Sequence, residues 1–223
     1  MKFSFRVLPA IRTILGITIT LPTKYIGMAI DEHLSWEMHV DGILKSLYKY
    51  YRLFYHMRHF VNKQLIRTIY YACVYSKIQY GIEVYGTCKT GLINKLQINQ
   101  NKLFQILGCK DRYYNSKLLH KELGILDITE TRDMLILKFV YNCVNGQPIE
   151  AFTDYFNTPE HTYNTRQADR LVTDNINTEY GRSLTHYTGS SLWNRIPPEI
   201  KNSPSVNSFK NRLKLFMVNN NLN

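Results

Sequence analysis

Residues 43–61 read ILKSLYKYYRLFYHMRHFV, a segment that carries two stripes at the spacing of an α-helix. The apolar stripe consists of Leu44, Leu47, Tyr51 and Phe54, and the cationic stripe of Lys45, Lys49, Arg52, His56 and His59. Because residues three or four apart share a helix face, one side is predicted to pack while the other presents cations. An ordinary solvated face is the alternative, but residues 43–61 contain no acid to partner these cations at i,i+4, which favours binding.

Positive charge is concentrated around this predicted helix. Between Gly42 and Lys110 the chain has eleven Lys or Arg and a single acid, Glu83, so this segment holds ten of the chain's eleven net positive charges. Aromatic residues make up 13% of the 223 residues, and seventeen of them are Tyr, whose rings suit wet or stacking surfaces. A basic, aromatic segment of this kind is typical of nucleic-acid binding, although an acidic protein partner would also fit.

The remaining periodicities predict a mainly α-helical fold with a short N-terminal β-hairpin. Residues 15–30 alternate as two strands around a break at Pro22-Thr23, and a polar connector follows at 31–41. The further predicted helices are 63–85, 92–107, 117–123, 128–144 and 208–218. The first is buried, and its end at 78–84 is either strand or frayed helix. Gly108 and Gly124 end the second and third, whereas the capping pair Asp127 and Glu130 opens the fourth, which Asn145-Gly146 and Pro148 close.

Composition suggests three parts: residues 1–41 with the hairpin and connector, 42–146 as a basic helical domain, and 147–223 as an irregular, α-containing extension. In the extension Asn, Thr, Gly and Pro become frequent, and periodicity is lost until the last helix. Residues 189–191 (Gly-Ser-Ser) are predicted to form a turn. The segment LWNRIPPEI (192–200) is predicted to be an anchored turn, in which Trp193 packs while Pro197 and Pro198 fix the chain direction.

Cysteine spacing and hydropathy indicate where in the cell the protein is expected and whether it meets a membrane. The cysteines at positions 73, 88, 109 and 143 lack metal-binding spacing, which predicts free, mostly buried thiols in a reduced intracellular protein, cytoplasmic or nuclear. Arg6 and Arg12 interrupt the N-terminal apolar run, so secretion is not expected. The most apolar window, residues 65–85, contains several charged residues, so neither a spanning helix nor a membrane partner is expected.

No pattern argues for catalysis. A two-metal polymerase or nuclease needs at least two converging carboxylates, and Asp31-Glu32 is the only adjacent acidic pair in the sequence. A polar strand exit is the favoured interpretation of that pair. His56-x-x-His59 lacks a companion ligand cluster, and phosphate-loop, dinucleotide-binding and nucleophile-elbow motifs are absent from the sequence. No metal or cofactor is therefore expected.

Six ordered phrases resemble the reverse transcriptases of non-LTR retrotransposons, the jockey-like elements and their relatives. KYIGMAIDEHLSWEMHVDGI (24–43) resembles the signature YLG-x-x-ID-x-x-L-x-W-x-x-HI. The matching residues are Tyr25, Gly27, Ile30, Asp31, Leu34, Trp36 and His39, of which Tyr25, Gly27, Asp31, Trp36 and His39 are assigned structural roles. The other phrases are YYACVYSKIQYGIEVYG (70–86), with Tyr85 where Trp is common; LQINQNKLFQILG (96–108); KLLHKELGIL (117–126); HTYNTR (161–166); and YTGSSLWNRIPPEIKNSPSVNSFKNRLK (187–214).

The resemblance implies the last palm strands, the helical thumb and the post-polymerase extension of an RNA-directed DNA polymerase. In that family the catalytic Ala-Asp-Asp motif lies upstream of the YLG signature, and only 24 residues precede Tyr25 here. The chain alone is therefore expected to be non-catalytic, and Mg²⁺ would belong to the missing catalytic palm.

The family's thumb packs on the template and primer duplex, which implies contacts from the basic segment. The candidate contact residues are Lys45, Lys49, Arg52, His56, Lys63, Arg67, Lys95 and Lys102. The expected partners are an RNA or DNA duplex and the missing fingers and palm of the polymerase. The alternative is a protein interaction module or a non-functional remnant of a decayed mobile element.

Overall fold

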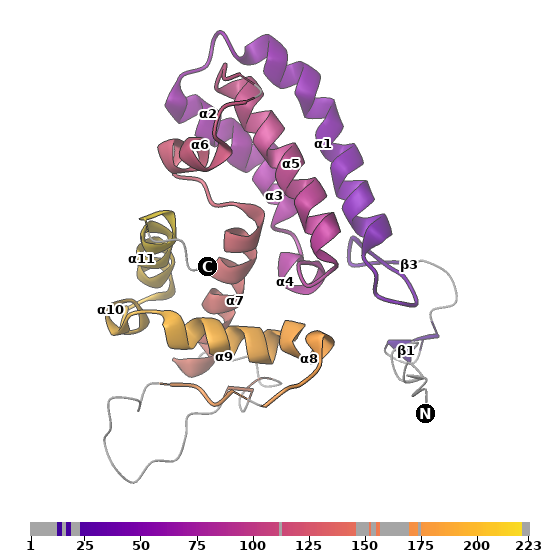
Figure 1. The fold of residues 1–223 in the computed structure, drawn as a ribbon, viewed down its shortest axis with the longest axis vertical. Coiled ribbons are helices and arrows are strands. Elements are labelled where there is room, and N and C mark those ends of the chain that lie inside the picture. Colours follow the sequence, from indigo (N-terminus) through magenta and orange to yellow (C-terminus); the bar gives the residue numbers. More distant parts are fainter. Residues whose placement is uncertain are drawn as a thin grey trace.

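The computed structural model describes residues 13–14, 17–18, 23–111, 113–145, 152, 155–156, 170–173 and 175–219 (Figure 1). Within them the fold is mainly helical with antiparallel hairpins near the N-terminus, which confirms the predicted fold class. The elements are β1 (Thr13–Ile14), β2 (Ile17–Thr18), β3 (Thr23–Tyr25), β4 (Met28–Ile30), α1 (Glu37–Met57), α2 (Lys63–Tyr70), the π-helical turn η2 (Tyr71–Tyr75), α3 (Ser76–Ile78), α4 (Ile82–Tyr85), α5 (Thr90–Leu107), α6 (Ser116–Leu123), α7 (Ile128–Val144), α8 (Glu179–Ser183), α9 (Thr185–Arg195), α10 (Pro198–Lys201) and α11 (Val206–Asn219).

The β3–β4 hairpin turns at Ile26 and Gly27, so the residues after the predicted break at Pro22-Thr23 form two strands and not the single strand that was predicted; Pro22 itself lies outside the described residues. Both turn residues have positive φ, 45° at Ile26 and 79° at Gly27, as a two-residue hairpin turn of the mirror-image type requires. Gly27 tolerates this conformation without strain. The Tyr80 hydroxyl donates a hydrogen bond to the Ile26 carbonyl, so a distant side chain holds the turn where local sequence gave little indication of it.

Helix α1 begins at Glu37, earlier than the predicted Ile43, because the preceding residues form a compact turn. Asp31 accepts hydrogen bonds from the backbone N–H groups of His33 (3.0 Å) and Ser35 (2.9 Å) and from the Ser35 hydroxyl (2.6 Å). Trp36 then adopts a left-handed conformation (φ 62°) directly before the helix. The connector is thus shorter than predicted, and the proposed boundary between residues 41 and 42 falls inside α1.

The segment 63–85 is helical in several short pieces rather than one. Helix α2 continues through η2 into α3, and the chain breaks at Gly81 (φ 71°) before α4 starts. The strand alternative for residues 78–84 was therefore wrong. Their apolar alternation reflects a change of helix direction, which lets both Ile78 and Ile82 be buried.

The next three predicted helices are confirmed as α5, α6 and α7. Asp127 and Glu130 form the predicted capping box at the start of α7, each side chain bonding the other residue's backbone N–H. At the end of α5, however, the left-handed residue is Cys109 (φ 49°) and not Gly108. The backbone N–H of Lys110 bonds the Gln105 carbonyl (2.9 Å), which completes a Schellman-type ending one residue later than the glycine suggested.

Two clusters of buried apolar side chains form the core. The first joins α1, α2 and α5 through residues such as Leu47, Tyr70 and Leu103, and the second joins α7, α9 and α11. Helix α7 contributes Ile128 to the first cluster and most of its other buried residues to the second. The predicted domain boundary at residue 146 and the HTYNTR phrase lie outside the described residues, so the three-part division stays a prediction.

The C-terminal part is more helical than predicted. Residues 189–191 lie inside α9, so the predicted Gly-Ser turn was wrong. Gly is a poor helix former and Ser an intermediate one, but here they allow close packing of α9 on α7. A Cβ on Gly189 would come within 2.9 Å of a methyl carbon of Val140, and Ser190 is fully buried. The predicted final helix is confirmed as α11, which begins at Val206.

All four cysteines are free thiols. Cys109 is exposed and the others are half-buried, so the expectation of mostly buried thiols was wrong. No helix in the described ranges has the length and hydropathy needed to cross a membrane.

Candidate nucleic-acid interface

The cationic stripe of α1 lies opposite its packed face. Lys45, Lys49, Arg52 and His56 are all exposed, whereas Leu47 and Phe54 on the other side are fully buried. From Lys45 to His56 the stripe extends about 16 Å along the helix axis, at 1.5 Å per residue. The stripe is therefore continuous over three turns and reaches solvent along its whole length.

Helix α5 adds two further cations beside α1, and the two helices lie side by side (Figure 1). The Tyr51 hydroxyl of α1 donates a hydrogen bond to Asn99 Oδ1 of α5 (2.8 Å). Lys95 and Lys102 are exposed and lie one helical turn before and after Asn99, so they share the α5 face that borders α1. We call Lys45, Lys49, Arg52, His56, Lys95 and Lys102 the α1–α5 surface.

The two candidate residues of α2 are not included in this surface. Arg67 is half-buried on α2, and its guanidinium lies 3.9 Å from where a Cβ on Gly124, at the end of α6, would sit. Lys63 starts α2, and its side chain is not described. Sequence position alone could not separate them from the others, because all eight lie in the same basic segment.

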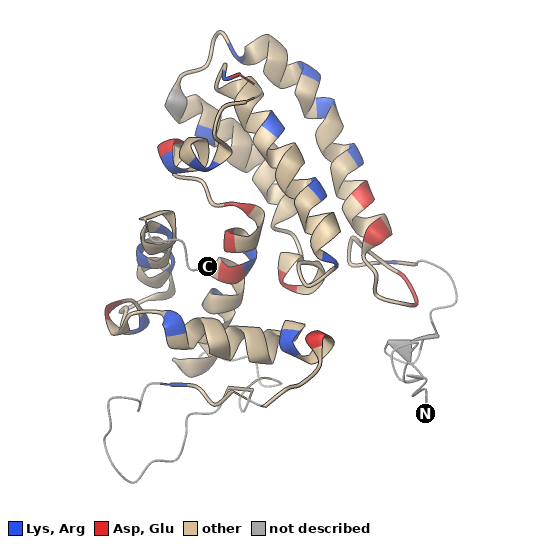
Figure 2. Ribbon diagram, viewed as in Figure 1, with Lys and Arg blue, Asp and Glu red and all other residues tan. Residues whose placement is uncertain are grey.

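In the described part of the chain, the lysines and the arginine of the α1–α5 surface form no ion pair, although the exposed Asp41 lies one helical turn before Lys45 on α1. Figure 2 shows the Lys and Arg positions recurring along α1 and α5, with acids confined on these helices to the start of α1. Within the described residues, ion pairs join His33 to Glu32, Lys89 to Glu37 and Arg132 to Asp133, and none includes this surface. This surface therefore has an excess of positive charge, and the resulting potential suits a polyanion.

Exposed tyrosine rings border the cations, although the charge and apolar patterns of the sequence did not point to them as candidate contact residues. Tyr48 and Tyr55 flank Tyr51 on α1 and are 54% and 53% exposed. Tyr48 lies 6.0 Å from Tyr51 between ring centroids, and burial, with a smaller effect from the neighbouring Tyr48, raises the pKa of Tyr51 to about 12. Tyr51 is therefore a neutral hydrogen-bond donor. The positions of Tyr48 and Tyr55, outside the apolar stripe, could have indicated their exposure.

The residues of the YLG-like phrase join the hairpin to α1 and α4. Trp36 and His39 are buried, and the His39 ring stands edge-on to both Trp36 (6.2 Å) and Tyr85 (4.9 Å). Ala29 in β4 donates its backbone N–H to His39 Nδ1 (3.3 Å), while Tyr25 at the end of β3 is 41% exposed. The phrase thus fixes the direction in which α1 leaves the hairpin.

The carboxylates of this region are used for structure. Burial alone would raise the pKa of Asp31, but its hydrogen bonds from Ser35 and His33 lower it below the usual value. Glu32 is exposed and pairs with His33 (3.1 Å). Across the described ranges no group of three or more His, Cys, Asp or Glu residues could hold a metal ion.

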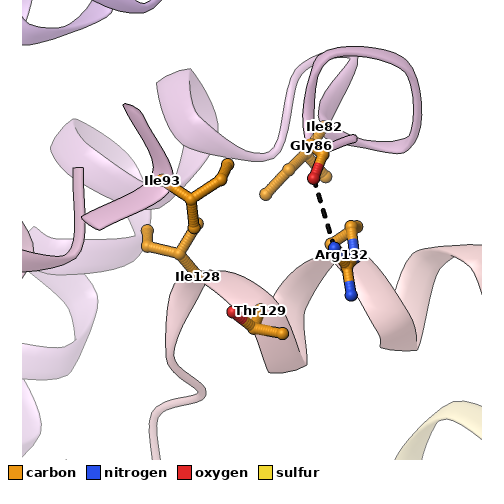
Figure 3. A pocket seen from close by; sticks show the side chains of 6 residues that line it. All are labelled: Ile82, Gly86, Ile93, Ile128, Thr129 and Arg132. Carbon is orange, nitrogen blue, oxygen red and sulfur yellow. Dashed lines mark hydrogen bonds between the residues drawn. The ribbon is translucent and has the colours of Figure 1, made fainter. Parts of the chain in front are cut away.

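A small hollow between α4, α5 and α7 is lined by Ile82, Gly86, Ile93, Ile128, Thr129 and Arg132 (Figure 3). It is too narrow to admit a water molecule. Arg132 Nη1 donates to the Gly86 carbonyl (3.2 Å), and its guanidinium pairs with the buried Asp133 (2.7 Å). Arg132 therefore joins α4 to α7 structurally, and the hollow does not form a small-molecule site.

In the C-terminal part, Trp193 is buried in the second cluster. Its ring lies 6.0 Å from that of Phe209, and the Lys201 ammonium lies 5.6 Å from its centroid. Pro197 precedes α10, and its carbonyl accepts the backbone N–H of Ile200 (3.1 Å). These contacts connect the end of α9 to α10 and α11.

The buried imidazole of His39 makes the hairpin joint sensitive to acid. Burial lowers its pKa below the ordinary value of 6.5, and Nδ1 must be unprotonated to accept the Ala29 N–H. The unfolded chain therefore takes up a proton at a higher pH than the folded one. His39 contributes stability that is complete above about pH 6.5 and is lost as the pH falls below it.

We expect the melting temperature of the parent chain to fall more between about pH 7.5 and about pH 5.5 than that of His39→Gln. Burial also lowers the pKa of His120 and raises that of Glu130 to about 7, and these two groups affect stability in opposite directions. Both are present in both proteins, so the difference between the two melting profiles reports His39. Identical profiles would show that His39 does not titrate with folding.

Among known proteins, a transposon polymerase is similar to this chain. It is the probable RNA-directed DNA polymerase from transposon BS of Drosophila melanogaster, with 23% identity over 123 residues. The match covers 52% of this chain and 13% of that protein. No protein-family profile matches the chain, and no solved structure does. The similarity supports a relation to the reverse transcriptases of retrotransposons.

Proposed function

We propose that this chain is a non-catalytic, nucleic-acid-holding part of a jockey-like retrotransposon reverse transcriptase. It comprises the end of the palm, the thumb and the post-polymerase extension, and it grips a template–primer duplex with the α1–α5 surface. The observation that carries the proposal is the exposure of five Lys or Arg side chains and His56 on two adjacent helices, none of which forms an ion pair within the described residues. Fingers and palm from the rest of the polymerase, with their Mg²⁺, are its partners in the cytoplasm or nucleus.

The geometry suits a duplex backbone better than base-specific recognition. A stripe about 16 Å long spans roughly five base-pair steps at 3.4 Å per step, so successive cations can meet successive phosphates. The side chains involved are Lys, Arg and His on solvent-facing helix positions, which contact phosphates without reading sequence. The similarity to an RNA-directed DNA polymerase favours nucleic acid over an acidic protein as the polyanion.

The test is a filter-binding titration of the chain with a blunt RNA/DNA hybrid at increasing salt. If about five phosphates are contacted, the log–log slope is expected near −4.5, and raising salt from about 50 to about 200 mM weakens binding roughly 500-fold. A blunt DNA duplex serves as the comparison for strand preference. Absence of binding at the lowest salt, or a slope near zero, would refute the proposal.

A further inference from the structure

Two loops meet at the end of the helical bundle where α1 and α5 finish (Figure 1). One contains residues 58–62, between α1 and α2, and the other contains residues 108–111 and 113–115, between α5 and α6. Cys109 Sγ lies 3.5 Å from the Arg58 carbonyl oxygen, so the loops are in contact. They form a single tip, although they are far apart in the sequence.

Each loop presents an aromatic ring almost entirely to solvent. Phe60 is 86% exposed and Tyr113 is 93% exposed, the highest values for large apolar side chains in the described part of the chain. Neither ring covers the core, and a Phe in this position gains nothing from burial within the chain. Exposed apolar groups gathered at one place on a protein generally indicate an interaction site.

Each loop also carries a cation, which lies against a different ring from Phe60 or Tyr113. The Arg58 guanidinium lies 3.9 Å from the centroid of the Tyr55 ring, and Lys110 Nζ lies 4.5 Å from that of Tyr114. None of the ion pairs in the described ranges includes Arg58 or Lys110, although Asp111 is exposed nearby. We call Arg58, Phe60, Lys110 and Tyr113 the tip surface.

We infer that the tip surface binds unpaired nucleotides, with bases stacked on Phe60 and Tyr113 and phosphates held by Arg58 and Lys110. Exposed aromatic rings and cations on one surface are the two elements of sequence-tolerant single-strand binding. A base-paired stack hides its faces, so protruding rings cannot stack on bases within a duplex. The charges also favour an anionic strand over an apolar peptide, because the tip cations would be left unpaired against apolar groups.

The placement of the tip extends the proposed function without depending on it. The cationic stripe of α1 runs to the C-terminal end of that helix, where the loop of residues 58–62 begins, so a strand leaving a duplex at that end of the α1–α5 surface would reach the tip. Binding at the tip needs only an unpaired strand. If the chain does not bind a duplex, the inference that the tip binds unpaired nucleotides can still be tested by measuring single-strand binding.

The experiment measures fluorescence anisotropy of a labelled single-stranded oligoadenylate and of a blunt RNA/DNA hybrid with the full chain. The double variant Phe60→Ala/Tyr113→Ala is expected to weaken single-strand binding by about tenfold or more for each ring, with hybrid affinity unchanged. Phe60→Trp should retain single-strand binding. Tyr180→Ala, which removes a ring 63% exposed on α8, is the matched control and should leave both affinities as in the parent.

Because both rings are exposed, the double variant is expected to melt like the parent, and a melting curve checks this directly. Three outcomes overturn the inference: a parent that does not bind the oligoadenylate, a double variant that binds it as tightly as the parent, or equal weakening of single-strand and hybrid binding. Under the first two, a protein partner becomes the better occupant of the tip.

Discussion

Replacing Lys45, Lys49 and Arg52 together by Gln is expected to weaken binding of a blunt RNA/DNA hybrid by about a hundredfold or more at about 0.1 M salt, and to reduce the log–log salt slope by roughly 2.7. Each of these side chains is exposed and forms no ion pair in the described part of the chain. A phosphate that the protein no longer neutralises keeps its condensed counterions, which is why affinity and slope change together. Filter binding over a range of salt concentrations measures both quantities.

A matched control separates this surface from net charge. Lys117, Lys121 and Lys210 are also exposed, but they lie on α6 and α11, and replacing them by Gln removes the same total charge. We expect that triple variant to lose only a small part of the affinity. Melting temperatures of both triple variants should stay close to that of the parent, since exposed substitutions usually change stability by less than about 0.5 kcal/mol each. Equal losses from both triples would mean that only overall charge matters, and an unchanged affinity would make the α1 stripe an ordinary solvated face.

Trp193→Ala is expected to lower the free energy of unfolding by about 3–5 kcal/mol. The indole is 3% exposed and lies within the cluster of α7, α9 and α11 beside Phe209, which itself stacks on Tyr141 with centroids 4.4 Å apart. Truncation leaves a cavity that surrounding helices can close only in part. Domains of this kind have about 5–15 kcal/mol of total stability, so the loss would be a large fraction of it.

Urea denaturation followed by circular dichroism measures the effect. Trp193→Phe keeps an aromatic ring in the same place and should cost less than the alanine variant, whereas Tyr180→Ala, at an exposed position, should cost little. An alanine variant that unfolds at the same urea concentration as the parent would show that Trp193 does not anchor the C-terminal helices.

Local patterns predicted the elements whose determinants are local. The capping pair Asp127 and Glu130 placed the start of α7, and Gly124 placed the end of α6, because both signals act through hydrogen bonds within a few residues. The hairpin turn and α9 were mispredicted for the opposite reason. Tyr80 holds the turn at Ile26, and packing against Val140 favours the Gly-Ser-Ser segment as helix, so distant residues decide both.

The same division holds for the candidate interface. Charge and helical spacing alone determined that α1 would pack on one side and present Lys45, Lys49 and Arg52 on the other, because the 3.6-residue period fixes relative directions along one helix. Only the tertiary structure decided that Lys95 and Lys102 lie on the face of α5 that borders α1, that Arg67 lies next to Gly124, and that the loops bearing Phe60 and Tyr113 meet at one tip. Which helices become neighbours depends on how buried side chains from distant segments fit together. No repeating pattern within a single segment of the sequence shows that fit.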